Sequence, residues 1–250
     1  MPEFADDFRG PALDRSKWVP FYLPHWSSRS ASGATARTGA DGLTLTIAPD
    51  QRPWLPDVDG PLRVSSIQTG EYAGPLGSPA GQHRFKPGLR VREEQPTERL
   101  YVPQYGRFEM RARMHIHPGQ LAALWMIGFE DQPKRSGEIT IMEIFGDAID
   151  GTGAELGHGI KAINDPLLST DFSAPRLAFS PAEFHVYAAQ WDAAGVSFFL
   201  DGSLLRRVAQ SPAYPMQFML NVYELTPRDM PPPVMQVDWF RGYPLSSPQG

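Results

Sequence analysis

Prolines and glycines interrupt this chain too often for long helices to form. The 26 prolines and 23 glycines are spread through all 250 residues, and a proline breaks a helix because it lacks an N–H group and clashes with the preceding turn. Between these breaks, apolar and polar residues alternate, as in strands with one buried face. The alternating segments are 42–49, 105–116, 184–191, 195–202, 216–225 and 235–244. We therefore predict a mostly β fold, a sandwich or jelly roll.

One tight turn and one long loop stand out between these segments. Asp201 and Gly202 separate two strand segments, which is a compact hairpin signal. Residues 74–104 contain several glycine and proline breaks together with the charged stretch RVREEQPTER. Loops of that length are usually functional or disordered, so we interpret this stretch as the rim of a cleft.

Charge and composition exclude several functions. A net charge of −5 argues against binding to nucleic acid or to an anionic membrane, because both need a basic surface. Without cysteines, the chain can form no disulfide, thiolate zinc site or cysteine nucleophile. No leader or membrane-spanning run is visible, so we expect a protein that acts inside the cell or is secreted after loss of a leader. With no repeat or linker composition, we expect one domain over 1–250 and a monomer.

Residues 136–146 read SGEITIMEIFG and embed two carboxylates, Glu138 and Glu143, in an apolar run. A helix would place them about 140° apart, and the β-branched residues between them disfavour a helix. A regular strand would put them on opposite faces and force one into the core. One extra residue, a β-bulge near Met142, restores the parity. Glu138, Thr140, Glu143 and Phe145 would then share an open face, while Ile139, Ile141 and Ile144 face the core.

Two carboxylates on one concave face suit the hydrolysis of a glycosidic bond. One attacks the anomeric carbon and the other protonates the leaving oxygen. Carboxyl groups about 5 to 5.5 Å apart would give retention through a covalent intermediate. The alternative is a solvated strand face that happens to carry two glutamates. The bulge parity, the nearby aromatic residues and the long loop favour catalysis.

The motif GEITIMEIFG resembles the signature of glycoside hydrolase family 16, the laminarinase- and lichenase-like enzymes of the concanavalin A-like superfamily. The family motif reads E-I-D-I-x-E followed by an aromatic residue. The resemblance continues along most of the chain, in the stretches FADDFRGPALDRSKW, YGRFEMRARM, LAALWMIG, FHVYAAQWDAAGVSFFLDG and VDWFRGYP. It implies a jelly roll of two curved antiparallel sheets with a concave substrate cleft. It also implies a retaining attack on β-linked glucans or galactans and no organic cofactor.

By this resemblance, Glu138 is the nucleophile and Glu143 the general acid/base. The family usually has aspartate at the position of Thr140. An anionic neighbour raises the pKa of the acid by like-charge repulsion, whereas a hydroxyl supplies only a hydrogen bond. Our hypothesis is that Thr140 orients Glu138 but leaves Glu143 more acidic than its family counterparts.

Aromatic rings that stack on sugar faces should line such a cleft. Trp125 matches a subsite tryptophan of the family, and its alternative role is in the core. The family also has a histidine–glycine pair after the motif, often with a second histidine where this chain has Lys161 and Ala162. The candidate substrate-binding residues are Trp125, Trp26, Phe145, His158, Trp191 and Tyr223. Trp191 is as plausible in the core as in the cleft.

The resemblance leaves a metal and the reaction outcome open. Asp238 matches a position where some family members hold a structural calcium, so calcium is an optional expectation, and no cofactor is required. The leading function is a retaining endo-β-glycanase acting on β-1,3- or mixed β-1,3/1,4-linked glucan, with a polysaccharide or oligosaccharide as its partner. The alternatives are a transglycosylase of the same family and a weakened carbohydrate-binding protein, the latter because of Thr140.

Overall fold

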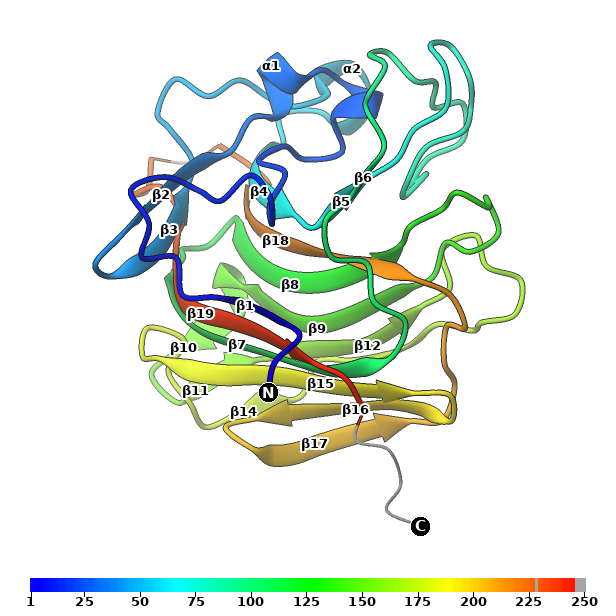
Figure 1. Cartoon of the computed structure of the whole chain (residues 1–250). Coiled ribbons are helices and arrows are strands. Elements are labelled where there is room, and N and C mark those ends of the chain that lie inside the picture. Colours follow the sequence, from blue (N-terminus) through cyan, green and yellow to red (C-terminus); the bar gives the residue numbers. More distant parts are fainter. Residues whose placement is uncertain (228, 246–250) are drawn as a thin grey trace.

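The computed structural model describes residues 1–227 and 229–245, which form an all-β sandwich of two antiparallel sheets (Figure 1). The outer sheet has the order β17-β16-β15-β7-β19-β3-β2, with β1 paired to β19. Its strands are β1 (Phe4–Asp6), β2 (Thr35–Gly39), β3 (Gly42–Thr46), β7 (Gly106–His115), β15 (His185–Asp192), β16 (Gly195–Leu200), β17 (Ser203–Val208) and β19 (Val234–Tyr243).

The inner sheet carries the glutamate motif and has the order β13-β12-β9-β8-β18-β4. Its strands are β4 (Arg63–Gln68), β8 (Gln120–Gly128), β9 (Glu138–Phe145), β12 (Gly157–Lys161), β13 (Asp171–Ser173) and β18 (Met216–Glu224). The remaining elements are short: η1 (Pro24–Trp26), α1 (Arg29–Ser32), α2 (Pro56–Asp59), β5 (Gly70–Glu71), β6 (Glu98–Arg99), η2 (Gly146–Ala148), β10 (Ile149–Asp150), β11 (Gly153–Glu155) and β14 (Arg176–Leu177). None of the described helices has the length and apolar character needed to span a membrane.

The strands fall where the sequence predicts them. Each of the six alternating segments overlaps one strand of the outer or inner sheet almost completely. The predicted hairpin joins β16 to β17, and Asp201 and Gly202 both have positive φ values, 50° and 79°. Two consecutive left-handed residues match the right-handed twist of the flanking strands, which is why aspartate and glycine suit this turn.

The main core lies between the two sheets and is built by the inward side chains of both. On β7 of the outer sheet, buried residues such as Phe108 and Met110 alternate with partly exposed ones, because the far side of that sheet faces solvent. On β8 and β18 of the inner sheet, every residue is buried. These two strands must therefore be covered on both faces.

The second cover of the inner sheet is a layer of loops. The N-terminal segment, with α1 and α2, and the 74–104 segment lie over its concave face, at the top of Figure 1. Side chains of this layer, including Trp26, Trp54 and Leu89, pack with Trp125 and Met219 of the sheet in a second apolar cluster. The loop layer leaves part of the concave face open, and the glutamate pair lies there.

Candidate active site

The predicted β-bulge is present in β9. Along β8, Leu124 pairs with Met142 and the next residue, Trp125, pairs with Thr140, so Ile141 is the extra residue. The pairing with β12 shifts at the same point. Both bulge residues, Ile141 and Met142, point into the main core. The bulge therefore returns Glu143 to the face that carries Glu138, as the spacing of the motif requires.

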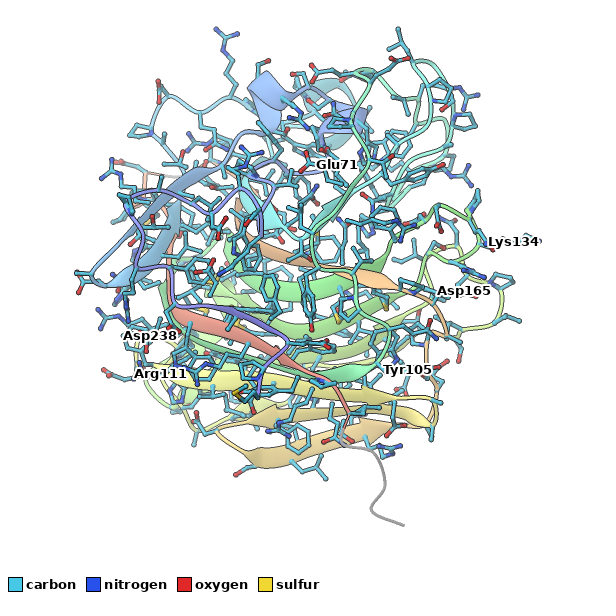
Figure 2. All side chains as sticks on the ribbon, in the orientation of Figure 1. Glu71, Tyr105, Arg111, Lys134, Asp165 and Asp238 are labelled. Carbon is cyan, nitrogen blue, oxygen red and sulfur yellow. The ribbon has the colours of Figure 1, made fainter. Side chains whose placement is uncertain are left out.

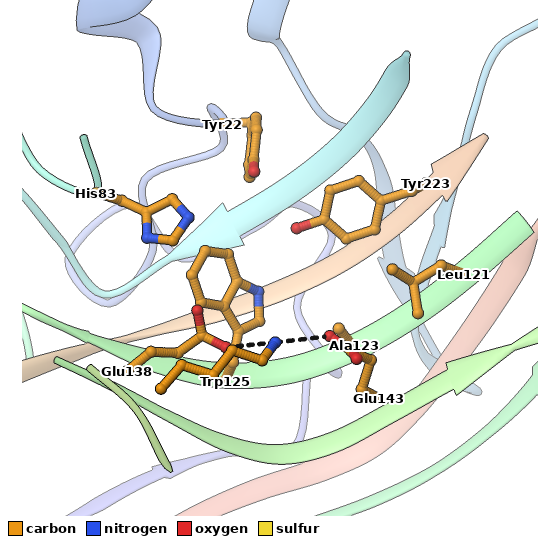
Figure 3. A pocket seen from close by; sticks show the side chains of 9 residues that line it. Tyr22, His83, Leu121, Ala123, Trp125, Glu138, Glu143 and Tyr223 are labelled. Atoms are coloured by element: carbon orange, nitrogen blue, oxygen red, sulfur yellow. Dashed lines mark hydrogen bonds and ion pairs between the residues drawn. The ribbon is translucent and has the colours of Figure 1, made fainter. Parts of the chain in front are cut away.

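The two glutamates are joined through Lys161, the last residue of β12. The Lys161 Nζ lies 2.9 Å from Oε1 of Glu138 and 3.2 Å from Oε2 of Glu143. The hydroxyl of Thr140 also donates to Oε1 of Glu138, at 2.6 Å. Figure 3 marks the interactions that bridge the two carboxylates with dashed lines.

Burial sets the protonation state of the second glutamate. Desolvation raises the pKa of Glu143 above its ordinary value, and the negative charge of Glu138 adds to the rise, whereas Lys161 opposes it. A carboxyl group that stays protonated to higher pH is suited to act as a general acid. Whether Thr140 makes Glu143 more acidic than its family counterparts stays a prediction.

A pocket of about 140 Å³ opens above the glutamates. Trp125 lies on its floor, and the rings of Tyr22, His83 and Tyr223 form the opposite wall (Figure 3). The Trp125 indole N–H donates to Oδ1 of Asn221 at 2.6 Å, which fixes the plane of the ring. Leu121 and Ala123 complete the lining. The pocket thus combines aromatic surface with a few polar groups, the composition of a sugar site.

His83 reaches the pocket from a strained backbone position in the 74–104 segment. Its φ of 50° lies in the left-handed region, and its backbone N–H donates to Oε1 of Glu130 at 2.5 Å. Its ring meets Trp125 edge-on, with centroids 4.9 Å apart. Burial lowers the pKa of His83, so the ring is neutral near pH 7. Its Nδ1 is buried without a hydrogen-bond partner among the described residues. Backbone strain that is held in place by a buried carboxyl group is typical of functional sites.

The structure places Trp125 and Tyr223 in the pocket but not the other two tryptophans. Trp26 is fully buried in the loop layer, where its indole N–H donates to the carbonyl of Gln82. Its polar sequence neighbours suggested exposure, but the 74–104 segment covers it. Trp191 is fully buried between the sheets, with its N–H on Ser211. Neither side chain lines the pocket, and for Trp191 the structure matches the core alternative.

Two further sequence candidates also lie outside the pocket. On β12, Lys161 faces the cleft, and His158 lies on the opposite face of the strand and points into the core. Its ring contacts Phe198, and its Nδ1 lies 2.9 Å from the carbonyl oxygen of Leu156. Phe145 is 39% exposed at the end of β9 and does not line the pocket. Phe145 is exposed, as expected for a residue on the face of β9 that carries the glutamates, but the pocket does not extend as far as this residue.

Asp238 lies on the outer sheet, next to Arg111 in Figure 2. Its two carboxylate oxygens bind the guanidinium groups of Arg9 and Arg111. Calcium would have to displace both arginines and then find further oxygen ligands. Within the described residues, no group of three or more histidine, aspartate or glutamate side chains could hold a metal ion.

Sequence reasoning missed Lys161, His83 and Tyr22 as site residues. Lys161 carried a usable signal, because it follows the alternation of β12 on the side opposite His158 and Ile160. His83 and Tyr22 carried none, since both come from irregular segments that reach the site only through tertiary packing.

Two carboxylates, joined by one ammonium group on the concave face of a β-sandwich, are the kind of pair that hydrolysis of a glycosidic bond requires. The sequence profile described as "Glycosyl hydrolases family 16" matches residues 100–241. The chain therefore belongs to glycosyl hydrolase family 16, as its motif indicated.

Among curated relatives, the chain is similar to a beta-glucanase of Rhodothermus marinus, with 36% identity over 112 residues that cover 41% of this chain and 37% of the relative. It is also similar to glucan endo-1,3-beta-glucosidase A1 of Niallia circulans, with 25% identity over 222 residues that cover 84% and 30%. The chain thus spans about a third of the length of these two relatives.

Among solved structures, the chain resembles a GlcNAcα1-4Gal-releasing endo-β-galactosidase from Clostridium perfringens. The TM-score is 0.86 at 30% identity, covering 97% of this chain and 61% of that one. The laminarinase of Rhodothermus marinus shares the fold, with a TM-score of 0.68 at 18% identity and 98% coverage of both chains.

Proposed function

We propose that this protein is a retaining endo-β-glycosidase in which Glu138 is the nucleophile and Glu143 the general acid/base. One observation carries the proposal. Lys161 Nζ contacts one oxygen of each carboxylate, so the distance between those two oxygens cannot exceed the sum of the two contact distances, about 6 Å. Retaining enzymes have carboxyl groups about 5 to 5.5 Å apart, whereas inverting enzymes need roughly 6.5 to 9.5 Å to admit a water.

The two steps follow from this geometry. In the first, Glu138 forms a bond to the anomeric carbon while the bond to the leaving oxygen breaks, and Glu143 gives its proton to that oxygen. In the second, Glu143 takes a proton from water as the water oxygen bonds to the anomeric carbon. The ester bond breaks, and its electron pair returns to Glu138.

Internal β-galactosidic linkages are the leading substrate class. The endo-β-galactosidase matches 97% of the present chain at 30% sequence identity. The laminarinase from Rhodothermus marinus has 18% sequence identity to the present chain. β-1,3-Glucan or mixed-linkage glucan is the second candidate, supported by the names of the two curated relatives. In either case Trp125 stacks on the sugar, and Nδ1 of His83 is available to a sugar hydroxyl.

Product release from a panel of glycans tests the proposal. The panel contains a glycan with an internal β-galactosidic linkage and a GlcNAcα1-4Gal terminus, laminarin and mixed-linkage glucan. Wild type should cleave one class, and Glu138→Gln should lose at least about 10⁴-fold in kcat/KM. Glu109→Gln removes a carboxylate from β7 of the opposite sheet and is the matched control. Equal cleavage by Glu138→Gln would contradict the assignment. Binding without cleavage by wild type would favour a carbohydrate-binding protein, and sugar transfer to an acceptor a transglycosylase.

A further inference from the structure

Lys161 lies between the two carboxylates that would act on the glycosidic bond. It pairs across the sheet with Glu138, and its Nζ lies 4.7 Å from the centre of the Phe172 ring while touching both glutamates. The side chain is 28% exposed, so the ammonium group faces the pocket and is not sealed in the core. This lysine is therefore a component of the site itself.

The contacts of Glu138 distinguish its two oxygens. Oε1 accepts hydrogen bonds from the Thr140 hydroxyl and from Lys161. Oε2 has no hydrogen bond from any described residue. Two donors on one oxygen fix the carboxylate plane and leave the other oxygen free to attack. Thr140 and Lys161 together thus select Oε2 as the nucleophilic atom.

The contact with Glu143 conflicts with its role as an acid. To protonate the leaving oxygen, Glu143 must carry a proton and lie within about 3 Å of that oxygen. In the structure, Nζ of Lys161 holds the hydrogen-bonding position at Oε2 of Glu143. An ammonium group on a flexible four-carbon stem can leave this position without any backbone movement.

We propose that Lys161 is a positioning residue that acts as the shared counter-ion of the catalytic pair, staying on Glu138 but leaving Glu143 when a glycoside enters the pocket. The inference rests on the proposed function. It predicts a larger effect on the second step than on the first. When the ester bond breaks, the electron pair returns to Glu138 as a carboxylate, which the nearby cation stabilises. Lys161 thus shortens the life of the covalent intermediate.

The other groups around Lys161 leave it as the main cation acting on Glu143. The titratable groups that face it are Glu138 and Glu143 from β9, His83 from the 74–104 segment, Tyr22 from the N-terminal segment and Tyr223 from β18. Burial raises the pKa of both tyrosines and lowers that of His83, so all three are neutral near pH 7. Removing Lys161 therefore changes the charge at Glu143 without a compensating cation in the pocket lining.

The first test compares pH–rate profiles of wild type and Lys161→Met. Loss of the cation should move the basic limb of kcat/KM upward by about 1 unit or more, because that limb reports Glu143 in the free enzyme. On a glycan whose first step limits turnover, the basic limb of kcat in wild type should lie at higher pH than the basic limb of kcat/KM, and this difference in pH should be smaller in the variant. Lys161→Arg keeps the positive charge, so the basic limb of its kcat/KM profile should stay at the pH of wild type. Lys134→Met, on an exposed loop, should match wild type.

The second test follows the covalent intermediate on an aryl glycoside with a good leaving group. Lys161→Met should show a burst of aryl alcohol, and intact-mass measurement should find the glycosyl-enzyme, while wild type accumulates at most about a tenth as much. Thermal unfolding verifies that the variant is folded. A folded, active Lys161→Met with an unmoved basic limb and no burst would overturn the inference but leave the proposed function intact. Failure of wild type to cleave any glycan removes both.

Discussion

The two faces of β9 differ in how they are built. The core face carries the apolar side chains of Ile139, Ile141, Met142 and Ile144, which pack between the sheets. The cleft face carries Glu138, Thr140 and Glu143. Lys161 of β12 contacts both glutamates, and the N-terminal and 74–104 segments add aromatic rings to the same pocket. One strand thus contributes both to the stability of the fold and to its chemistry. Substitutions on the two faces should have separable effects.

The largest effect should come from Glu143→Gln on the cleft face. Loss of the general acid should lower kcat/KM for a natural glycan by about 10² to 10⁴-fold. An aryl glycoside with a good leaving group needs no acid, so its cleavage should be much less impaired in the first step. Azide, a nucleophile that needs no base, should restore turnover of that substrate. Equal losses on both substrates would contradict the acid/base assignment.

On the core face, Ile139→Ala should have the opposite signature. Removing a fully buried isoleucine should lower the free energy of unfolding by about 2 to 5 kcal/mol. The kcat of the folded fraction, assayed well below the melting temperature, should stay within a few-fold of wild type. Ile139→Val should cost about 0.5 to 1.5 kcal/mol. Intact stability with lost activity would show that the two faces are not separable.

Thr140→Val tests the hydrogen bond between Thr140 and Glu138 on the cleft face, beside the bulge. The isosteric change removes the donor at 2.6 Å from Oε1 of Glu138, and kcat/KM should fall by about 10- to 100-fold, because hydrogen bonds to charged groups are worth about 1.5 to 3 kcal/mol. Thr140→Asp is the companion variant. If Thr140 makes Glu143 more acidic than in other family members, Thr140→Asp should move the basic limb to higher pH. An unmoved limb and an unchanged rate would remove that hypothesis.

The smallest effect concerns Glu130, which holds the backbone of His83 at the cleft. Burial raises its pKa from 4.5 to about 8. The folded chain therefore binds more protons than the unfolded chain between these values, and its stability falls as pH rises from about 4.5 to about 8. Glu130→Gln should remove this contribution, making the variant about 1 to 3 kcal/mol more stable than wild type at pH 8 and equal to it near pH 4. Parallel stability curves for the two proteins would contradict the buried, protonated carboxyl.

The features that could be predicted from sequence are those set by neighbouring residues. Strand alternation, the Asp201–Gly202 turn and the bulge each follow from backbone geometry over a few positions. The bulge was predictable because regular pairing would have buried a charge. The all-buried run of β8 also contained a signal for the loop layer, since a strand that is apolar on both faces needs two covers.

The errors lie where distant segments decide the environment. Trp26 has polar neighbours in sequence, yet a loop more than 50 residues later supplies the carbonyl that its indole binds. His158 points into the core because it lies on the face of β12 opposite Lys161, and the glutamate motif alone does not show which face that is. His83 depends on a left-handed backbone held by Glu130. Such long-range partners leave no local pattern.

The stereochemistry of the first product tests most directly whether Glu138 and Glu143 form a retaining pair. Proton NMR of a cleavage reaction, recorded before mutarotation, distinguishes the two anomers at the new reducing end. The spacing imposed by Lys161 predicts that the β-anomer forms first and the α-anomer appears only as the sugar equilibrates. If the α-anomer forms first, the carboxylates admit a water between them and the retaining mechanism is wrong.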